Sequence, residues 1–233
     1  MKLCNIYVED EWPTDLCGLK MYVQEVCESE LHATGHYLRY EDGKLTLYYH
    51  QELGQLALTL DFDAELRKLD SQVLGLKSDP LKRLLRTKVK SEMPSSIVEI
   101  GTGAGKDTMH FLALGLSVIS YERHPLMYYL CLDALRRAKD PRLSKLQLNF
   151  GPIDESLLRD AWVFFDPMFE HDKNRSAKSP KAMQIFQSLA LPADGATIFA
   201  AIKGASPKKI IVKRSRKQKS FTPPNPSYSL EGR

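Results

Sequence analysis

The hydrophobic pattern divides the chain into two parts. The first part alternates apolar and polar residues over short runs separated by glycines: residues 2–8, 44–49 and 53–62. Alternation with a period of two is typical of strands that bury one face. We therefore expect a small β-rich N-terminal region over residues 1–78 and a second, larger domain over residues 79–233.

Beyond residue 95, short apolar runs alternate with amphipathic segments. The apolar runs predict buried strands at residues 97–100, 116–121, 143–150, 162–165 and 209–213. The amphipathic segments predict helices after Gly105 and at residues 79–91, 125–138, 154–158 and 180–189. Residues 196–202 fit either pattern, and we assign them to a helix because a strand would leave no room for a crossover before Ile210. This alternation predicts an α/β fold with a doubly wound parallel sheet.

A cluster of glycines follows the first strand of the predicted sheet, in the run Glu99-Ile100-Gly101-Thr102-Gly103-Ala104-Gly105. Glycines let the backbone pass close to a bound ligand. Lys106 stands where a dinucleotide fingerprint has its last glycine, which argues against an NAD-dependent oxidoreductase. Glu122 ends the second strand, where a carboxylate can accept both ribose hydroxyls of a nucleotide-like cofactor. Asn149-Phe150-Gly151 follows the third strand, where such folds contact adenine.

Asp166-Pro167-Met168-Phe169 follows the fourth predicted strand, at the sheet edge where open α/β sheets bind ligands. The run resembles the (Asp/Asn)-Pro-Pro-(Tyr/Phe) signature of methyltransferases that modify exocyclic amines of nucleobases. In that signature the acid and a following backbone carbonyl accept hydrogen bonds from the amine, and the aromatic ring stacks on the base. Two acceptors favour a pyramidal nitrogen and drain positive charge as the methyl group arrives. An ordinary Asp-Pro turn is the alternative reading of these four residues.

Charge is distributed unevenly along the chain. The net charge is +4, yet residues 173–219 contain 12 Lys and Arg against one acid, Asp194. Such a segment predicts a basic face for a polyanion. No apolar run is long enough to span a membrane and no signal peptide opens the chain, so we expect a cytoplasmic protein. The four cysteines have no metal-binding spacing, so we expect free thiols and no metal site.

Several blocks of the chain, in order, resemble the family of small-subunit ribosomal RNA guanine-N2 methyltransferases known as methyltransferase J. The resemblance runs from about Ile97 to Lys213. Its blocks are Gly103-Ala104-Gly105-Lys106-Asp107, Glu122-Arg123, Asp166-Pro167-Met168-Phe169-Glu170-His171, Ser176-Ala177, Phe186-Gln187-Ser188-Leu189 and Ile210-Ile211-Val212-Lys213-Arg214.

The chain also departs from the family pattern. Glu170 replaces the usual proline, and residues 63–75 contain little glycine where the family has a glycine-rich, basic segment. The family continues into a final strand with an Arg-(Phe/Tyr)-Asp-(Ile/Val)-Tyr run, which residues 228–233 do not contain. A sheet without that strand would have an exposed edge.

The resemblance implies a class I S-adenosylmethionine-dependent methyltransferase with a Rossmann-like sheet. It implies transfer of a methyl group to N2 of a guanine in small-subunit (16S) ribosomal RNA, with that RNA or the small subunit as partner. The implied catalytic residues are Asp166, Pro167, Met168 and Phe169. The implied cofactor-binding residues are Gly101, Gly103, Gly105, Lys106, Asp107, Glu122, Arg123, Gly151 and Asp166. The implied RNA-binding residues are Lys173, Arg175, Lys178, Lys181 and Lys213.

Two alternatives stay open at this point. One is an amino methyltransferase that acts on another nucleobase, on DNA or on a small molecule. An enzyme with a small-molecule substrate would have no use for the basic segment. The other is a methyltransferase-like protein that binds RNA without turnover. The presence of both Glu122 and Asp166 argues against the second.

Overall fold

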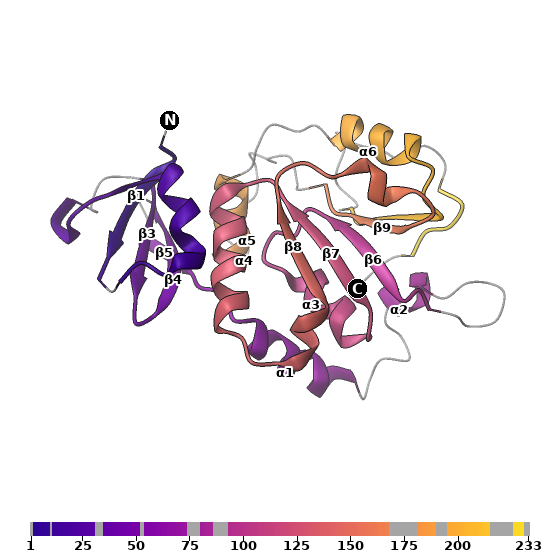
Figure 1. The fold of residues 1–233 in the computed structure, drawn as a ribbon, viewed down its shortest axis with the longest axis horizontal. Coiled ribbons are helices and arrows are strands. Elements are labelled where there is room, and N and C mark those ends of the chain that lie inside the picture. The colour runs from indigo at the N-terminus through magenta and orange to yellow at the C-terminus, as the bar shows by residue number, and fades with distance from the viewer. Residues whose placement is uncertain are drawn as a thin grey trace.

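The computed structural model describes residues 2–9, 11–30, 35–51, 54–73, 80–85, 93–167, 181–189, 195–214 and 226–230. These residues form two five-stranded sheets that lie side by side, with helix α4 (Pro125–Arg137) standing between them (Figure 1). Among the helices in these ranges, none is long and apolar enough to cross a membrane.

The N-terminal sheet has the strand order β2-β1-β3-β4-β5. Its elements are β1 (Cys4–Val8), η1 (Thr14–Met21), β2 (Val23–Glu25), η2 (Glu28–Glu30), β3 (Gly35–Glu41), β4 (Lys44–Gln51) and β5 (Gly54–Leu58). Strand β1 pairs in parallel with both β2 and β3, and the β3–β4 hairpin turns at Asp42 and Gly43 with φ values of 51° and 69°. Two consecutive positive φ angles are typical of the hairpin turn whose twist matches that of the strands. The β-rich N-terminal region is confirmed.

Helix α1 (Phe62–Val73) was not predicted, because the run 53–62 was read as one strand. Strand β5 ends at Leu58, and Asp61 then starts the helix by accepting a hydrogen bond from the N–H of Ala64 (2.8 Å). Helix α2 (Pro80–Leu85) lies inside the predicted helix 79–91, whose remaining residues lie outside the described ranges.

The second sheet is wholly parallel and has the order β10-β9-β6-β7-β8. Its strands are β6 (Ser96–Ile100), β7 (Ser117–Glu122), β8 (Leu146–Phe150), β9 (Trp162–Phe165) and β10 (Lys209–Val212). The chain starts at the central strand β6, runs to the β8 edge, and crosses back to β9. Strand order therefore reverses between β6 and β9, and ligands bind outside the carboxyl ends of strands at such a point.

The elements between these strands follow the predicted alternation. They are α3 (Lys106–Ala113), α4, η4 (Pro141–Lys145), η5 (Glu155–Leu158), α5 (Lys181–Ser188) and α6 (Gly195–Gly204). Helix α6 confirms the helical assignment of residues 196–202. The predicted strand 143–150 was too long, because the η4 turn, capped by the Asp140 side chain, takes up residues 143–145. The doubly wound α/β fold is confirmed.

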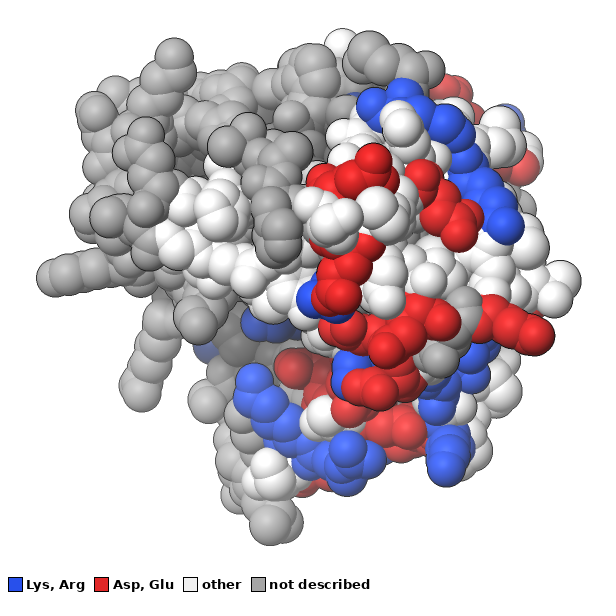
Figure 2. Space-filling model, turned by 90° about the vertical axis from the view of Figure 1, so that its left-hand side faces the viewer, with Lys and Arg blue, Asp and Glu red and all other residues white. Residues whose placement is uncertain are grey.

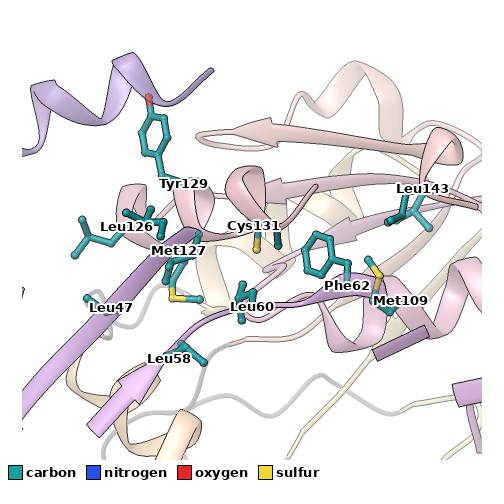
Figure 3. Packing of buried hydrophobic residues seen from close by; sticks show 14 of the residues in the cluster. Leu47, Leu58, Leu60, Phe62, Met109, Leu126, Met127, Tyr129, Cys131 and Leu143 are labelled. Atoms are coloured by element: carbon teal, nitrogen blue, oxygen red, sulfur yellow. The ribbon is translucent and has the colours of Figure 1, made fainter. Parts of the chain in front are cut away.

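Two apolar clusters cover the two faces of the parallel sheet. The smaller joins Val98, Val163 and Phe165 to Ile202 of α6. The larger is continuous with the N-terminal sheet: residues from β4, α1, α3 and α4, among them Leu47, Phe62, Met109 and Met127, lie in one cluster (Figure 3). Helix α4 thus packs on both sheets, so the N-terminal sheet is part of the support of the parallel sheet.

Asp133 of α4 reinforces this junction with hydrogen bonds. Its fully buried carboxylate accepts the backbone N–H of Leu45 (3.0 Å) and forms ion pairs with Arg136 and Arg137 (2.8 Å each). Arg136 also donates to the carbonyl of Gly43 (2.8 Å), and Arg137 donates to the carbonyl of Leu60 (2.6 Å). We name Asp133, Arg136 and Arg137 the α4 latch. It ties the last turns of α4 to the N-terminal region.

Candidate active site

The glycine run forms a tight loop between β6 and α3. Gly101, Gly103 and Gly105 all have positive φ, at 93°, 55° and 72°. A Cβ atom at Gly101 would lie 2.8 Å from the backbone oxygen of Asp166, and one at Gly105 would lie 2.8 Å from the ring of Phe62. Both the conformation and the space therefore require glycine. The loop thus packs directly against Asp166, the residue that follows β9.

Glu122 holds this loop from the neighbouring strand β7. Its side chain is buried, its Oε2 accepts the N–H of Gly103 (2.8 Å), and its Oε1 accepts the N–H of His124 (2.8 Å). Burial raises the pKa of this carboxyl, and the backbone donors oppose the rise. The Glu122 carbonyl also accepts the N–H of Gly151 (2.9 Å). Each carboxylate oxygen has a further lone pair, so Glu122 can hold the loop and still accept a ligand hydroxyl.

An aromatic platform lies at the carboxyl end of β8. Phe150 is 41% exposed, unusual for a side chain of its size. Its ring centroid lies 5.2 Å from that of Tyr128 in α4 and 5.8 Å from that of Tyr22, which follows η1. The sequence pointed to Phe150 through the Asn149-Phe150-Gly151 run, whereas Tyr22 and Tyr128 were missed because neither lies in a motif. The platform offers an apolar face for a planar ring such as adenine.

Asp166 lies directly after β9, beside the glycine loop. Its N–H donates to the carbonyl of Ile100 (3.2 Å), and its side chain is only 14% exposed. Oδ2 lies 3.3 Å from Nζ of Lys213, while Oδ1 is buried and has no hydrogen-bond partner among the described residues. Burial raises the pKa of this carboxyl to about 6; the Lys213 charge opposes the rise and Asp107 adds to it. A buried acceptor without a partner is costly, and such atoms mark functional sites.

Lys213 and Asp107 complete this acidic corner. Nζ of Lys213 lies 2.5 Å from Oδ2 of Asp107, which stands in the first turn of α3. The sequence assigned Lys213 to RNA and Asp107 to the cofactor, and the structure brings both side chains next to Asp166. The signal in the sequence that could have indicated this contact was the position of the two residues, because Lys213 and Asp166 each directly follow a strand and these strands are neighbours in the sheet.

Glu99 lies beneath the loop and was not predicted as a site residue. Its side chain is fully buried in β6, and Oε2 accepts hydrogen bonds from Thr108 (2.5 Å) and Ser120 (2.7 Å). Burial raises the pKa of this carboxyl to about 8, and the two hydroxyl donors oppose the rise. Glu99 is therefore mainly protonated at neutral pH, and through Thr108 and Ser120 it connects β6 to α3 and β7.

The remaining predicted site residues lie around this corner or outside the described ranges. Pro167 is buried next to Asp166, Lys106 is exposed at the start of α3, and Arg123 follows Glu122 at the end of β7. Five residues, Met168, Phe169, Lys173, Arg175 and Lys178, lie outside the described ranges, and only the backbone of Lys181 is described. Their roles stay predictions.

Comparisons with known proteins agree with this geometry. A family model described as "Putative SAM-dependent methyltransferase" matches residues 22–233. A solved SAM-dependent methyltransferase from Neisseria gonorrhoeae has the same fold, with a TM-score of 0.60 and 20% identity over 96% of this chain and 90% of that one.

Two curated relatives carry the name ribosomal RNA small subunit methyltransferase J. The protein from Aeromonas hydrophila is 34% identical over 146 residues, a match that spans 58% of this chain and 58% of the relative. The protein from Shewanella baltica is 30% identical over 224 residues, which cover 90% of this chain and 86% of the relative. With its parallel sheet, glycine loop and Asp166 corner, the chain belongs to the SAM-dependent methyltransferase family that includes ribosomal RNA small subunit methyltransferase J.

Proposed function

We propose that this protein transfers a methyl group from S-adenosylmethionine to the exocyclic N2 of a guanine in small-subunit (16S) ribosomal RNA. The observation that carries the proposal is Oδ1 of Asp166, a buried acceptor beside the glycine loop with no partner among the described residues. An exocyclic amine supplies the N–H donor that this oxygen lacks. The names of the relatives support ribosomal RNA as the substrate.

The residues around the loop fit S-adenosylmethionine. At Gly101 a Cβ would collide with the Asp166 carbonyl, so the loop has to present bare backbone to a ligand at this point. Glu122 has acceptor capacity for the ribose hydroxyls, and Phe150 offers its exposed ring to adenine. Gly103, Gly105 and Gly151 would complete the backbone around the cofactor, and Lys106 and Arg123 would add positive charge to its site. When bound, this cofactor supplies an electrophilic methyl group.

Asp166 would act on the attacking amine. The lone pair of an exocyclic amine is delocalised into the base, so the nitrogen is a poor nucleophile. Oδ1 and a backbone carbonyl after Asp166 would accept its two N–H groups and stabilise the positive charge that develops during transfer. An ionised carboxylate is the better acceptor, and the pKa of about 6 leaves Asp166 mainly ionised at neutral pH. Phe169 would stack on the base, which must leave its stack or start unpaired to reach this site.

We also propose that RNA approaches from the side of the basic segment 173–219 and not across the N-terminal sheet. Residues 1–62 contain eleven Asp and Glu against four Lys and Arg. Figure 2 views the side of the molecule on which the N-terminal sheet lies. Across the middle of the described part of this face it shows Asp and Glu, with Lys and Arg mainly at the borders. Such a surface repels phosphates. We keep 1–78 and 79–233 as the domain boundaries of this proposal, and we propose the cytoplasm as the location of the protein.

The test is methylation of small subunits prepared from a strain that lacks the gene. Purified protein with labelled S-adenosylmethionine should yield N2-methylguanosine, identified by mass spectrometry of nucleosides. Asp166→Asn, which keeps the shape and removes the charge, should lower kcat by about a hundredfold or more while cofactor affinity changes little. Glu155→Gln, at an exposed acid of η5, is the matched control. Methylation of another nucleoside, or an Asp166→Asn variant with normal turnover, would refute the proposal.

A further inference from the structure

Lys213 is held at the active-site edge by the sheet itself. Its backbone N–H donates to the carbonyl of Phe165 (3.0 Å), continuing the β9–β10 pairing in which Val212 lies opposite Phe165. This register places Lys213 beside Asp166, the residue that follows Phe165. Its backbone position at this edge is therefore fixed by two parallel strands.

Lys213 contacts two acids that come from different parts of the chain. Its Nζ contacts Asp107 of α3 and Asp166 after β9. Burial raises the pKa of Glu99 of β6, and the charges of these two carboxylates add to the rise. Lys213 is the cation that forms ion pairs with both of these carboxylates. An ammonium group has three donors, and the two carboxylates occupy two of them. A phosphate contact would have to compete with these ion pairs.

We propose that Lys213 is a positioning residue for methyl transfer, which holds Oδ2 of Asp166 so that Oδ1 stays ionised and directed at the target amine. The inference rests on the function proposed above. The sequence placed Lys213 among the RNA-binding residues, and the inference assigns it to the reaction centre instead. Asp107 is the second ion-pair partner of its ammonium group.

The physical consequence is a dependence of activity on pH. Even with Lys213 present, burial and the nearby Asp107 raise the pKa of Asp166 to about 6. Removing an opposite charge at this distance raises the pKa of a carboxyl further, by roughly one to three units. Because the Lys213 side chain is 46% exposed, water screens part of its effect, and the low end of that range applies. Asp166 would then be about half protonated at pH 7, and the protonated fraction would lack the negative charge that stabilises the amine.

The experiment is a single-turnover pH–rate profile for wild type and three variants, with saturating cofactor and RNA. In Lys213→Met the acid limb should move up by roughly one unit, so that the rate falls about twofold at pH 7, approaches a roughly tenfold fall below pH 6, and recovers in alkali. Lys213→Arg keeps the charge and should stay near the wild-type profile. Lys208→Met removes an equal charge at the opposite end of β10 and should leave the profile unchanged.

Two further measurements separate this role from phosphate binding. Cofactor affinity by calorimetry and the salt dependence of RNA affinity should both be unchanged in Lys213→Met. If the acid limb instead stays in place, while KM for RNA rises and the salt slope falls by about 0.7 to 0.9, Lys213 contacts a phosphate and the inference is overturned.

A carboxyl titration by carbon-13 NMR makes the test independent of turnover, with Asp166→Asn identifying the resonance. In the Lys213→Met protein the Asp166 titration should move to higher pH; an unmoved titration overturns the inference even if methylation is confirmed. A moved titration in a protein that does not methylate RNA would instead overturn the proposed function. Should Lys213→Met fail to fold, Lys213→Gln carries the same expectations.

Discussion

The α4 latch allows a quantitative prediction about stability. Asp133→Asn keeps the shape of the side chain, removes its charge, and turns one acceptor oxygen into a donor facing arginine. The Asp133 side chain is fully buried and has three donors in the structure, the N–H of Leu45 and the guanidinium groups of Arg136 and Arg137. The variant therefore leaves two arginines without their shared counter-charge.

The magnitude follows from the burial of each partner. Removing one member of a buried ion pair costs about 3–5 kcal/mol. Arg136 and Arg137 are 25% and 24% exposed and can be partly rehydrated, so the low end, about 3 kcal/mol, applies to the free energy of unfolding. For a chain of 150–250 residues each kcal/mol lowers Tm by about 2–4 °C, which gives a fall of about 6–12 °C.

Calorimetric Tm and urea unfolding of both proteins provide the assay. Asp70→Asn is the matched control, because Asp70 also forms an ion pair with an arginine, Arg142, but at the surface. We expect no measurable change of Tm in that control, since exposed pairs contribute little. A Tm of Asp133→Asn within about 2 °C of wild type would show that apolar packing, and not the latch, fixes α4 against the N-terminal sheet.

Three further predictions concern the site. Glu99 has a folded-state pKa of about 8 against an ordinary 4.5, so between these values the folded protein keeps a proton that the unfolded chain releases. The contribution of Glu99 to the free energy of unfolding is therefore complete below pH 4.5 and is lost as the pH rises to about 8. Glu99→Gln should make the fall of the free energy of unfolding with pH less steep, as measured by urea titrations at several pH values. Equal slopes in both proteins would contradict it. Glu122→Ala should weaken cofactor binding about tenfold to a hundredfold in calorimetry, on the scale of one charged hydrogen-bond acceptor, and wild-type affinity would remove Glu122 from the cofactor site. Phe150→Ala should weaken cofactor binding by roughly 1–3 kcal/mol, because the stacking on adenine is lost. Leu157→Ala, at another exposed apolar residue, is the control and should leave cofactor binding unchanged. Equal affinities in the two variants would place adenine elsewhere.

Local patterns in the sequence determined most of the parallel sheet. Periodicity identifies a strand or a helix within about ten residues, and the order of such elements constrains the topology. The strands ending at Ile100, Glu122 and Phe165 were therefore predicted within a residue of their observed ends. The glycines after Ile100 and the Asp-Pro after Phe165 pointed to the ligand edge because their chemistry is local as well.

The tertiary structure decided everything that depends on pairing between distant residues. Lys213 and Asp107 are 106 positions apart, and Asp133 and Leu45 are 88 apart. No local pattern encodes either contact. A lysine after a strand reads as surface charge until the neighbouring strand brings Asp166 beside it. An aspartate inside an amphipathic helix likewise reads as solvated until a second sheet covers it. Charge and burial of a side chain are properties of its surroundings, and these are assembled only when the strands find their register.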